Sequence, residues 1–525
     1  MFRSAIVFGV ALFLAPIAAF ATVPEAGRPE AAEFEDLRFP IRGFALNGNL
    51  VIATDRILNA LKSYLGEAQT ADALLQAGDA VYRLYQEAGY EMVSVELPPE
   101  IGIDGIVQLR VLETTIGRVT VSGNEHYSSN YFRAVLPSLQ ENHSPNLAGL
   151  ARELFSANDH SGYKLALSFT PEINGHANVE IKVQDSSPLR AALSVDSSGT
   201  EATGRSRATL TASHANLWGA GHEMTAGYTT SPELPRKVHQ FIVSYNLPLP
   251  ALGDRLQLGY SYSNVDAGRV ADAFNVSGQG STYSLRLQHD LQRTATTRHL
   301  IEFGIDDKRY KNTIDFFGFN LGVNVNARPL SFNYVFADRD GATSTSASLG
   351  YARNIPGGAR NDDLTYDESR AGARPSWSAW RANVEHTSAM ASRWILHTAI
   401  DAQYAPAPLI SAEQFGLGGA RSIRGFQERE TSGDSGWRLS GEVLAPPISE
   451  QHRLLAFVDA GRHYRLNLLP GEPAGTLLLS YGLGWRWTLV KSIYTSLDWA
   501  RVVRGTTATP RGSSAVHFSA SWRFV

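Results

Sequence analysis

The spacing of hydrophobic residues changes once along the chain, close to residue 188. Before that point, apolar side chains recur every three or four residues in several segments, which predicts amphipathic helices. After it, apolar and polar side chains alternate to the last residue, which predicts β-strands. We therefore expect an α+β part followed by an all-β part.

The α+β part carries the same pattern twice. An alternating run ends in Asn47-Gly48-Asn49 in the first copy and in Ser122-Gly123-Asn124 in the second, and two helical segments and two strands follow each. This repetition predicts two small modules, over residues 38–113 and 114–186. The two turns, the helix end at Ala88-Gly89-Tyr90 and Leu97-Pro98 before the last strand resemble POTRA domains, which are periplasmic modules that bind polypeptides. An unrelated pair of small α+β domains is the alternative.

Each strand of the second part has one apolar face and one face of small or polar residues. In one strand the apolar face is Tyr481, Leu483, Trp485 and Trp487, and the other face is Ser480, Gly482, Gly484 and Arg486. Lipid outside and water inside require such faces, and strands in hydrocarbon must close into a barrel so that every backbone group is paired. We count about sixteen strands over residues 187–525, with unclear alternation at 312–326.

A soluble β-sandwich or propeller is the competing interpretation of these strands. Against it, the apolar faces often end in aromatic residues, as the aromatic girdles of membrane barrels do. Examples are Tyr245, Tyr262, Trp394, Tyr404, Trp487 and Trp499. The pattern therefore favours two α+β modules followed by an antiparallel transmembrane β-barrel.

The N-terminus has the features of an export signal. Arg3 is followed by an apolar core at 6–14 and by the small-x-small sequence Ala19-Phe20-Ala21, which predicts a signal peptide at 1–21. A short lead rich in Pro, Glu and Ala follows at 22–37. No later stretch is apolar for the length of a membrane helix. These features agree with a bacterial outer-membrane protein whose N-terminal modules lie in the periplasm.

Composition excludes several classes of function. The 525 residues carry a net charge of -4 without a basic segment, which argues against a nucleic-acid partner. The chain has no cysteine, so disulfides and thiolate sites are impossible. His397, Asp401 and Asp498 alternate into the lumen without the spacing of a metal site or a Ser/His/Asp set. We expect no catalytic residue, no metal and no cofactor.

Two motifs stand out in the barrel part. The first follows the glycine-rich segment Phe415-Gly416-Leu417-Gly418-Gly419 on a long connection and consists of Ser422, Ile423, Arg424, Gly425 and Phe426. The second, Phe457-Val458-Asp459-Ala460-Gly461, lies on a strand soon after it.

With the two modules and the barrel, these motifs resemble the TpsB transporters of two-partner secretion, the haemolysin and filamentous haemagglutinin secretion family. That family belongs to a superfamily that also contains the outer-membrane barrel insertases. The resemblance covers essentially the whole mature chain. It implies that the loop with the Arg-Gly-Phe sequence folds back into the barrel and pairs with the F-x-D-x-G motif of the wall.

Alternation allows the geometry of this pair to be predicted. If Val458 and its alternate neighbours face lipid, Phe457, Asp459 and Gly461 must face the lumen. Arg424 then reaches Asp459 only if its loop enters the lumen. The alternative is a solvated Arg424, with Asp459 satisfied by water or by another arginine.

Glycines are expected to let the loop approach the wall. Gly418, Gly419 and Gly425 permit tight turns, and a guanidinium–carboxylate contact is frequently bidentate. Phe426 is expected to pack against a glycine gap at Gly482 or Gly484, or against Phe457.

The predicted function is an outer-membrane transporter that captures an unfolded exoprotein with its periplasmic modules, by strand addition, and secretes it through the barrel. Its expected partners are the exoprotein, outer-membrane lipid and, during biogenesis, the barrel-assembly machinery. An assembly or insertion factor of the same superfamily is the first alternative, although such proteins usually have three or more modules. A passive porin would not need the modules, and an outer-membrane enzyme lacks a visible nucleophile.

The best-known branch of the family has a plug helix before the first module. Here only about sixteen residues separate the predicted cleavage site from that module, too few for a helix that spans the barrel plus a linker. We expect no plug helix, so that the motif loop is the main obstruction of the lumen.

Overall fold

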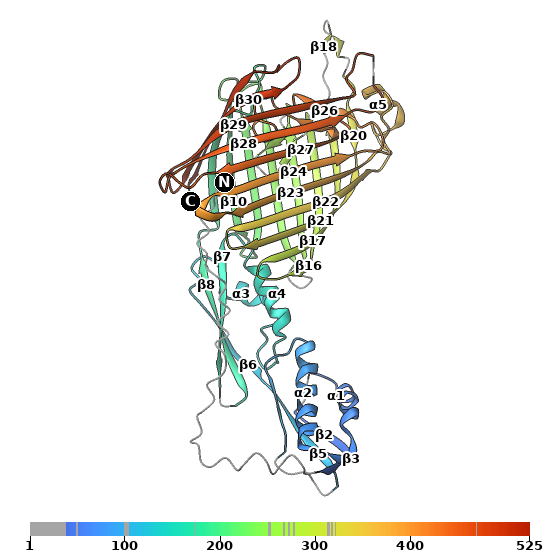
Figure 1. Cartoon of the computed structure of the whole chain (residues 1–525), viewed down its shortest axis with the longest axis vertical. Coiled ribbons are helices and arrows are strands. Elements are labelled where there is room, and N and C mark those ends of the chain that lie inside the picture. The colour runs from blue at the N-terminus through green and yellow to red at the C-terminus, as the bar shows by residue number, and fades with distance from the viewer. Residues whose placement is uncertain are drawn as a thin grey trace. The chain divides into compact units, whose positions relative to one another are not determined.

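The structure is a computed structural model that describes residues 38–524 with short gaps (Figure 1). The gaps are at 49–50, 99–103, 173, 250–253, 266–267, 271–273, 277–278, 312–314, 317–318, 321 and 469. The predicted signal peptide, the lead at 22–37 and the expected absence of a plug helix therefore lie outside the described residues. The chain divides into two compact units, Met1–Ser186 and Ser187–Val525.

The first unit contains two modules of the same topology. The elements of the first module are β1 Phe39–Ile41, β2 Gly43–Asn47, α1 Thr54–Leu61, η1 Lys62–Tyr64, β3 Gly66–Gln69, α2 Ala71–Glu87, β4 Val93–Glu96 and β5 Ile106–Glu113. Those of the second are β6 Thr115–Ser122, α3 Ser129–Val135, α4 Leu147–Ala157, β7 Tyr163–Pro171 and β8 His176–Asp185. The sheets have the orders β2-β5-β4 and β6-β8-β7, and β1 pairs with β3 in a small separate sheet.

Each module buries the apolar face of its helices against its sheet. In the first, Ile57, Leu61, Val81 and Tyr85 pack on Val107 and its neighbours of β5. In the second, helical and sheet residues form an equivalent cluster, which includes Phe132, Leu136, Leu150, Leu154 and Ile181. No helix in the described part of the chain is long and apolar enough to cross a membrane.

Glycine is required at each repeated turn for the same structural reason. Gly48 and Gly123 have φ of 88° and 78°, where residues with a side chain are strained. A Cβ at either position would also collide with a backbone carbonyl of the central strand, at Val111 and Val183 respectively. The repeat in the sequence is therefore a repeat of one close approach between two strands.

The second unit is a closed antiparallel barrel (Figure 1). Its strands are β9 Leu189–Asp196, β10 Arg207–Leu217, β11 His222–Thr230, β12 Gln240–Leu249, β13 Asp254–Ser263, β16 Gly280–Arg293, β17 Thr297–Tyr310, β20 Val325–Ala327, β21 Pro329–Asp340, β22 Thr343–Asn354, β23 Ser378–Ala389, β24 Ile395–Tyr404, β27 Ser435–Leu444, β28 His452–Tyr464, β29 Gly475–Val490, β30 Ile493–Arg504 and β31 Ser514–Phe524. Because β20 and β21 both pair with β17 and form one spanning strand, the barrel has sixteen strands, as predicted.

The barrel closes where β31 pairs with β9, from Ser519 opposite Asp196 to Phe524 opposite Ala191. Shorter elements lie in the connections. They are β14 Gly268–Val270, β15 Phe274–Val276, β18 Asp315–Phe316, β19 Phe319–Asn320, α5 Asp363–Ser369, η3 Ala391–Arg393, η4 Ser411–Glu413, β25 Phe415–Leu417 and β26 Thr431–Gly433.

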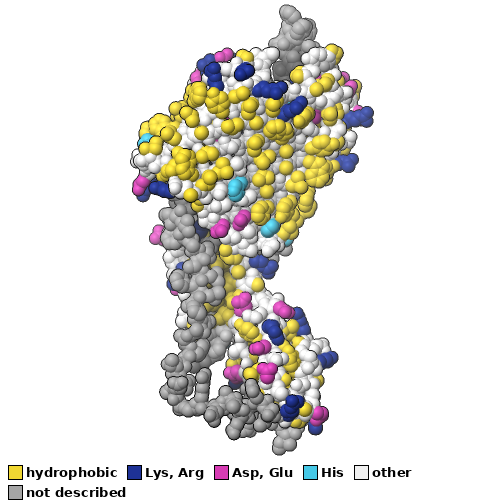
Figure 2. Space-filling view, in the orientation of Figure 1, with side chains coloured by type: hydrophobic (Ala, Val, Ile, Leu, Met, Phe, Trp, Pro, Cys, Tyr) yellow, Lys and Arg dark blue, Asp and Glu magenta, His cyan; other side chains and the backbone are white. Residues whose placement is uncertain are grey.

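The outer surface of the barrel is apolar. Figure 2 shows hydrophobic side chains over most of the visible strand surface. Exposure alternates along the strands: in β28, Leu454, Ala456 and Val458 are exposed, whereas Leu455, Phe457 and Asp459 are buried. Large exposed side chains of this kind include Phe303, Phe332, Leu349, Ile400, Leu439, Leu483, Trp499 and Phe518. An exposed apolar belt with polar residues on the opposite face is the pattern of a membrane barrel.

The connections differ between the two ends of the barrel. At the end where the chain enters, the turns are short, as at 341–342 and 491–492. At the far end they are long. The connections 355–377 and 405–434 are several times longer than the usual connection of about four to six residues. The connection 355–377 contributes Tyr366 and Trp377 to a separate buried hydrophobic cluster. The connection 405–434 carries the Arg-Gly-Phe motif.

The two faces of the barrel predict different responses to the same charge. Leu483→Lys places an ammonium group in hydrocarbon and should lower the free energy of unfolding by about 2–4 kcal/mol. Ser348→Lys, the matched control, faces the lumen, lines its cavity and should change stability little. Chemical unfolding in lipid vesicles measures both. Equal losses for the two variants would contradict the assignment of the faces.

Candidate functional site: a loop docked in the barrel lumen

The connection between β24 and β27, residues 405–434, folds back into the barrel. Its arms, β25 and β26, form a short hairpin in which Phe415 pairs with Gly433 and Leu417 with Thr431. The hairpin holds the tip, residues 418–430, against the inner wall of strands β27 to β31 through the contacts described below. We call residues 405–434 the motif loop.

Glycines shape the tip of the motif loop. Gly418, Gly419 and Gly425 have φ of 111°, 107° and 99°, conformations that favour glycine. A Cβ on Gly419 would overlap the carboxylate of Glu428, which accepts a hydrogen bond from the Ala420 N–H at 2.8 Å. Ser422 closes the turn, since its hydroxyl accepts from the Gly418 N–H at 3.3 Å.

Arg424 makes a bidentate contact with Asp459. Its Nε lies 2.7 Å from Oδ2 and its Nη2 lies 2.8 Å from Oδ1, and the Arg424 backbone N–H also donates to Oδ2 at 3.1 Å. Arg424 is 4% exposed and Asp459 is 0% exposed. The contact is therefore removed from bulk water. A buried, bidentate ion pair of this kind is costly to break, because loss of one partner leaves the other charge buried and unpaired.

Further acidic and polar groups surround the guanidinium. Arg424 donates from Nη1 to Glu442 at 2.6 Å, and the same nitrogen lies 3.6 Å from Asp498. Ser440 accepts from Nη2 at 3.3 Å and donates to Asp459 at 2.7 Å. Arg486 pairs with Asp498, at 2.5 Å, and so limits the excess of negative charge. The site therefore needs lumen-facing residues from four different strands.

The other two residues of the F-x-D-x-G motif, Phe457 and Gly461, also contact the motif loop. The ring of Phe457 lies under the guanidinium of Arg424, with Cζ 3.4 Å from the ring centroid, which permits a cation–π interaction. Gly461 leaves room for Ile423, whose Cδ1 would lie 2.7 Å from a Cβ at this position. Each member of the wall motif thus contacts the tip of the motif loop.

Phe426 does not fill the gap expected at Gly482 or Gly484. Phe426 lies with Leu417, Ile423, Leu478 and Val502 in one buried cluster. The space at Gly482 is taken by the ring of Phe457, and Leu455 and Asp498 approach the position of a Cβ at Gly484. These two glycines therefore make room for side chains of the wall itself and not for the loop.

Gly425 allows the backbone of the tip to touch the wall. A Cβ at Gly425 would lie 3.2 Å from Val502 and 3.3 Å from Ala500, which is tighter than ordinary contacts. Its N–H donates to Nε2 of His517 on β31 at 2.9 Å. A side chain at residue 425 would therefore push the tip away from β30.

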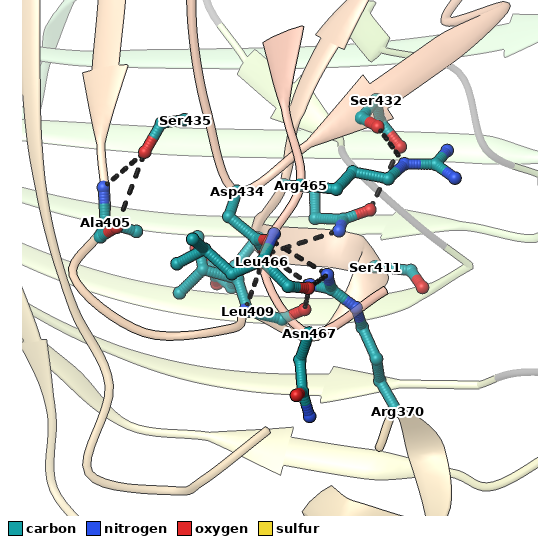
Figure 3. A network of polar contacts seen from close by, with 12 residues as sticks. Arg370, Ala405, Leu409, Ser411, Ser432, Asp434, Ser435, Arg465, Leu466 and Asn467 are labelled. Carbon is teal, nitrogen blue, oxygen red and sulfur yellow. Dashed lines mark hydrogen bonds and ion pairs between the residues drawn. The ribbon is translucent and has the colours of Figure 1, made fainter. Parts of the chain in front are cut away.

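The base of the motif loop is fastened by a buried carboxylate (Figure 3). Asp434, 0% exposed, accepts hydrogen bonds from Arg370, from the Leu409 N–H at 2.8 Å and from the Leu466 N–H at 2.7 Å. Arg370 belongs to the connection 355–377, and Leu466 to the connection after β28. One carboxylate therefore holds three connections together at the far end of the barrel.

A second buried carboxylate, Glu413, ties the motif loop to the opposite wall. It accepts from Lys308 and Tyr310 of β17 at 2.8 Å each, and from Arg381 of β23 at 2.9 Å. Neither Glu413 nor Asp434 belongs to a motif that sequence reasoning recognised. Their only signal is an acidic residue beside an apolar or glycine-rich segment, which is too common to identify a site.

A cavity of about 710 Å³ remains beside the docked loop. Its wall comes from strands β13 to β24, from Arg438 of β27 and from the motif loop, and it carries small polar residues such as Ser261, Ser284 and Ser348. The tip of the motif loop, by contrast, contacts strands β27 to β31. The lumen is thus divided between the loop on one side and polar space on the other. Within the described residues, no group of three or more His, Asp or Glu side chains is arranged to hold a metal ion.

A sixteen-strand membrane barrel with a docked lumen loop and two preceding α+β modules places the protein among the outer-membrane barrels that carry POTRA domains. The family of haemolysin secretion/activation proteins ShlB/FhaC/HecB matches residues 175–487, and the ShlB-type POTRA domain matches 39–114. The chain therefore belongs to the ShlB/FhaC/HecB family. It is an outer-membrane transporter of two-partner secretion, with its N-terminal domains in the periplasm.

Individual relatives align with most of the chain. The Heme/hemopexin transporter protein HuxB of Haemophilus influenzae is 22% identical over 508 residues, which cover 94% of this chain and 85% of the relative. The Outer membrane transporter CdiB of Dickeya dadantii is 21% identical and covers 81% of this chain and 76% of the relative.

Solved structures share the fold. CdiB from Escherichia coli superposes with a TM-score of 0.71 at 16% identity, over 95% of this chain and 93% of that structure. BamA from Haemophilus ducreyi lacking POTRA domains 1–3 has a TM-score of 0.52 at 13% identity, over 93% of this chain and 100% of that structure.

The buried contact predicts a selective effect of one arginine. Arg424→Ala leaves Asp459 without its cation and should cost the docked loop about 3–5 kcal/mol. The loop should then leave the wall more often, and the conductance of single channels in planar bilayers should rise. Arg421→Ala, in the same tip but with a side chain 39% exposed, is the matched control and should change conductance little. The same conductance in both variants would argue against docking through Arg424.

Proposed function

We propose that this transporter captures an unfolded exoprotein in the periplasm and that the Arg424–Asp459 contact is the latch that opens to let it through. The observation that carries the proposal is a buried, bidentate ion pair between a loop tip and the lumen wall. The guanidinium makes its contacts with Asp459, Glu442 and Ser440 as one group, so these contacts are lost together when Arg424 leaves the wall.

The position of the tip supports a loop that moves. The tip lies in the lumen against strands β27 to β31, and a cavity of about 710 Å³ remains beside it. Withdrawal of the tip would join the space it occupies to this cavity and would give an extended chain a wider path.

The modules offer edges for strand addition. In the second module one edge strand, β6, is covered: its Ile116 N–H donates to the His143 carbonyl at 3.0 Å, and its Val119 carbonyl accepts from Arg133 at 2.6 Å. The opposite edge strand, β7, pairs only with β8 among the described strands. We assign capture of the unfolded exoprotein to open edges such as β7.

The finer assignments belong to the same proposal. Residues 1–21 would be the signal peptide, 38–113 and 114–186 the two POTRA-like domains, and 187–525 the barrel. Transport needs no ATP in this account, since folding of the exoprotein outside the cell supplies the free energy. The barrel-assembly machinery would insert the barrel, and no catalytic step is assigned to any residue.

An assembly or insertion factor is the alternative function expected from the sequence. BamA shares the fold, but likeness at 13% identity extends to the fold alone and assigns no function. Two modules and the two-motif contact favour secretion. A gene for a large exported protein beside the gene of this chain would decide for secretion.

Removal of residues 38–186 separates a secretion pore from a passive porin. The barrel has its own closed hydrogen-bond network, so the shortened protein should still insert and run as a folded, heat-modifiable species. Secretion of a co-expressed, epitope-tagged exoprotein should be lost, because the capture step is gone. Immunoblots of culture medium and outer membranes measure the two quantities. Undiminished secretion would identify a pore that does not need its modules.

A further inference from the structure

The boundary between the two modules is crossed by two separate connections. The first is covalent and short, since β5 ends at Glu113, β6 begins at Thr115, and Thr114 alone lies between them. The Thr114 N–H donates to the Met92 carbonyl at 2.9 Å, which fixes this residue against the first module. A linker of one anchored residue leaves little freedom to bend.

The second connection joins the ends of two helices. The Leu147 N–H, at the start of α4, donates to the Gly89 carbonyl, just past the end of α2, at 2.8 Å. Helix ends leave N–H and C=O groups without partners inside the helix. Here such a group at the start of one helix pairs with a carbonyl at the end of another, across the module boundary. The positive end of the α4 dipole also faces the negative end of α2.

Asn146 completes this joint with both ends of its side chain. Its Oδ1 accepts from the Gly149 N–H at 2.8 Å and so caps α4. Its Nδ2 donates to the Ala88 carbonyl of the first module at 2.8 Å. Gly89 provides the room, since a Cβ there would lie 2.6 Å from Asn146 Oδ1, and its φ of 88° suits glycine.

The first module is braced behind the joint. Tyr85 of α2 donates from its hydroxyl to Glu113 at 2.6 Å, and Glu113 also accepts from the Val51 N–H at 3.0 Å. Burial and this carboxylate raise the pKa of the Tyr85 phenol, so it remains a donor at every physiological pH. The end of α2 and the end of β5, where the two connections start, are therefore held to each other.

We propose that Asn146 and the α2–α4 contact join the two modules into one rigid body, which presents their sheet edges to the exoprotein in a fixed relation. Two connections at separate points prevent the rotation that a single linker allows. A rigid pair of modules binds a long extended chain without first losing the freedom of a hinge, which favours capture. The role in capture rests on the proposed function, whereas the rigid joint does not.

Asn146→Asp tests the joint without unfolding the second module. A carboxylate still accepts from the Gly149 N–H and is favourable at a helix N-terminus, so α4 keeps its cap. It has no donor for the Ala88 carbonyl and repels it. The matched control is Asn158→Asp, which removes a comparable amide donor, to the Leu165 carbonyl at 2.9 Å, inside the second module.

The measurement is the distribution of distances between two spin labels, on Asp79→Cys of α2 and Arg152→Cys of α4. Both sites are exposed, and the chain has no other cysteine. The full-length protein in lipid nanodiscs should give one narrow distribution, and so should Asn158→Asp. Asn146→Asp should broaden it, with helix content unchanged, because losing one hydrogen bond lowers the joined population roughly fivefold relative to the open one.

Secretion of a co-expressed, epitope-tagged exoprotein, measured in the same variants without labels, should fall several-fold in Asn146→Asp alone. A broad distribution in the unaltered protein, or an unchanged one in Asn146→Asp, would overturn the rigid joint. A broadened distribution with secretion equal to that of Asn158→Asp would overturn its role in capture. A narrow distribution in a protein that secretes nothing would support the joint and contradict the proposed function instead.

Discussion

The architecture of this transporter depends on the burial of one guanidinium in the wall of a membrane pore. Arg424 is almost wholly removed from water, and a charge in that position costs several kcal/mol unless it is fully paired. Asp459 pairs with it, and Ser440 and Glu442 supply the remaining acceptors. These groups face the lumen only because every strand keeps its alternation and register. The docking of the loop therefore depends on the register of the strands that carry these groups, β27 and β28.

The two ends of the motif loop are held in different ways, and this difference has a functional meaning. The base is held by Asp434, whose partners come from three connections at the far end, and by Glu413, which reaches the opposite wall. The tip is held by the cluster around Arg424, by the apolar contacts of Ile423 and Phe426, and by hydrogen bonds to His517, Thr506 and Thr509. Release of these contacts would free the tip while the base remains in place. The loop is thus built as a hinged obstruction, in keeping with a pore that must be closed at rest and open to an extended chain.

Much of this structure was predictable from the sequence, for physical reasons that can be named. Alternation predicts the sixteen strands and their faces, because lipid and water impose a period of two. The repeated glycine turns predict two modules of one topology, although β1 and β3 are too short to leave a pattern. The contacts of Glu413, Asp434 and His517 join residues far apart in the chain, and no local rule pairs them. The expected packing of Phe426 against Gly482 or Gly484 was not found for a related reason. The sequence suggests free space at these two glycines, but side chains of neighbouring strands occupy it.

The most direct test of the account is to tie the tip of the motif loop to the wall and measure secretion. Ile423 and Gly461 lie in contact, so Ile423→Cys and Gly461→Cys place two thiols together in a chain without other cysteines. Oxidation of this pair should stop secretion of a co-expressed, epitope-tagged exoprotein, a reductant should restore it, and Ile423→Cys alone should secrete normally. Undiminished secretion with the disulfide fully formed would show that the loop does not leave the wall and would contradict the account.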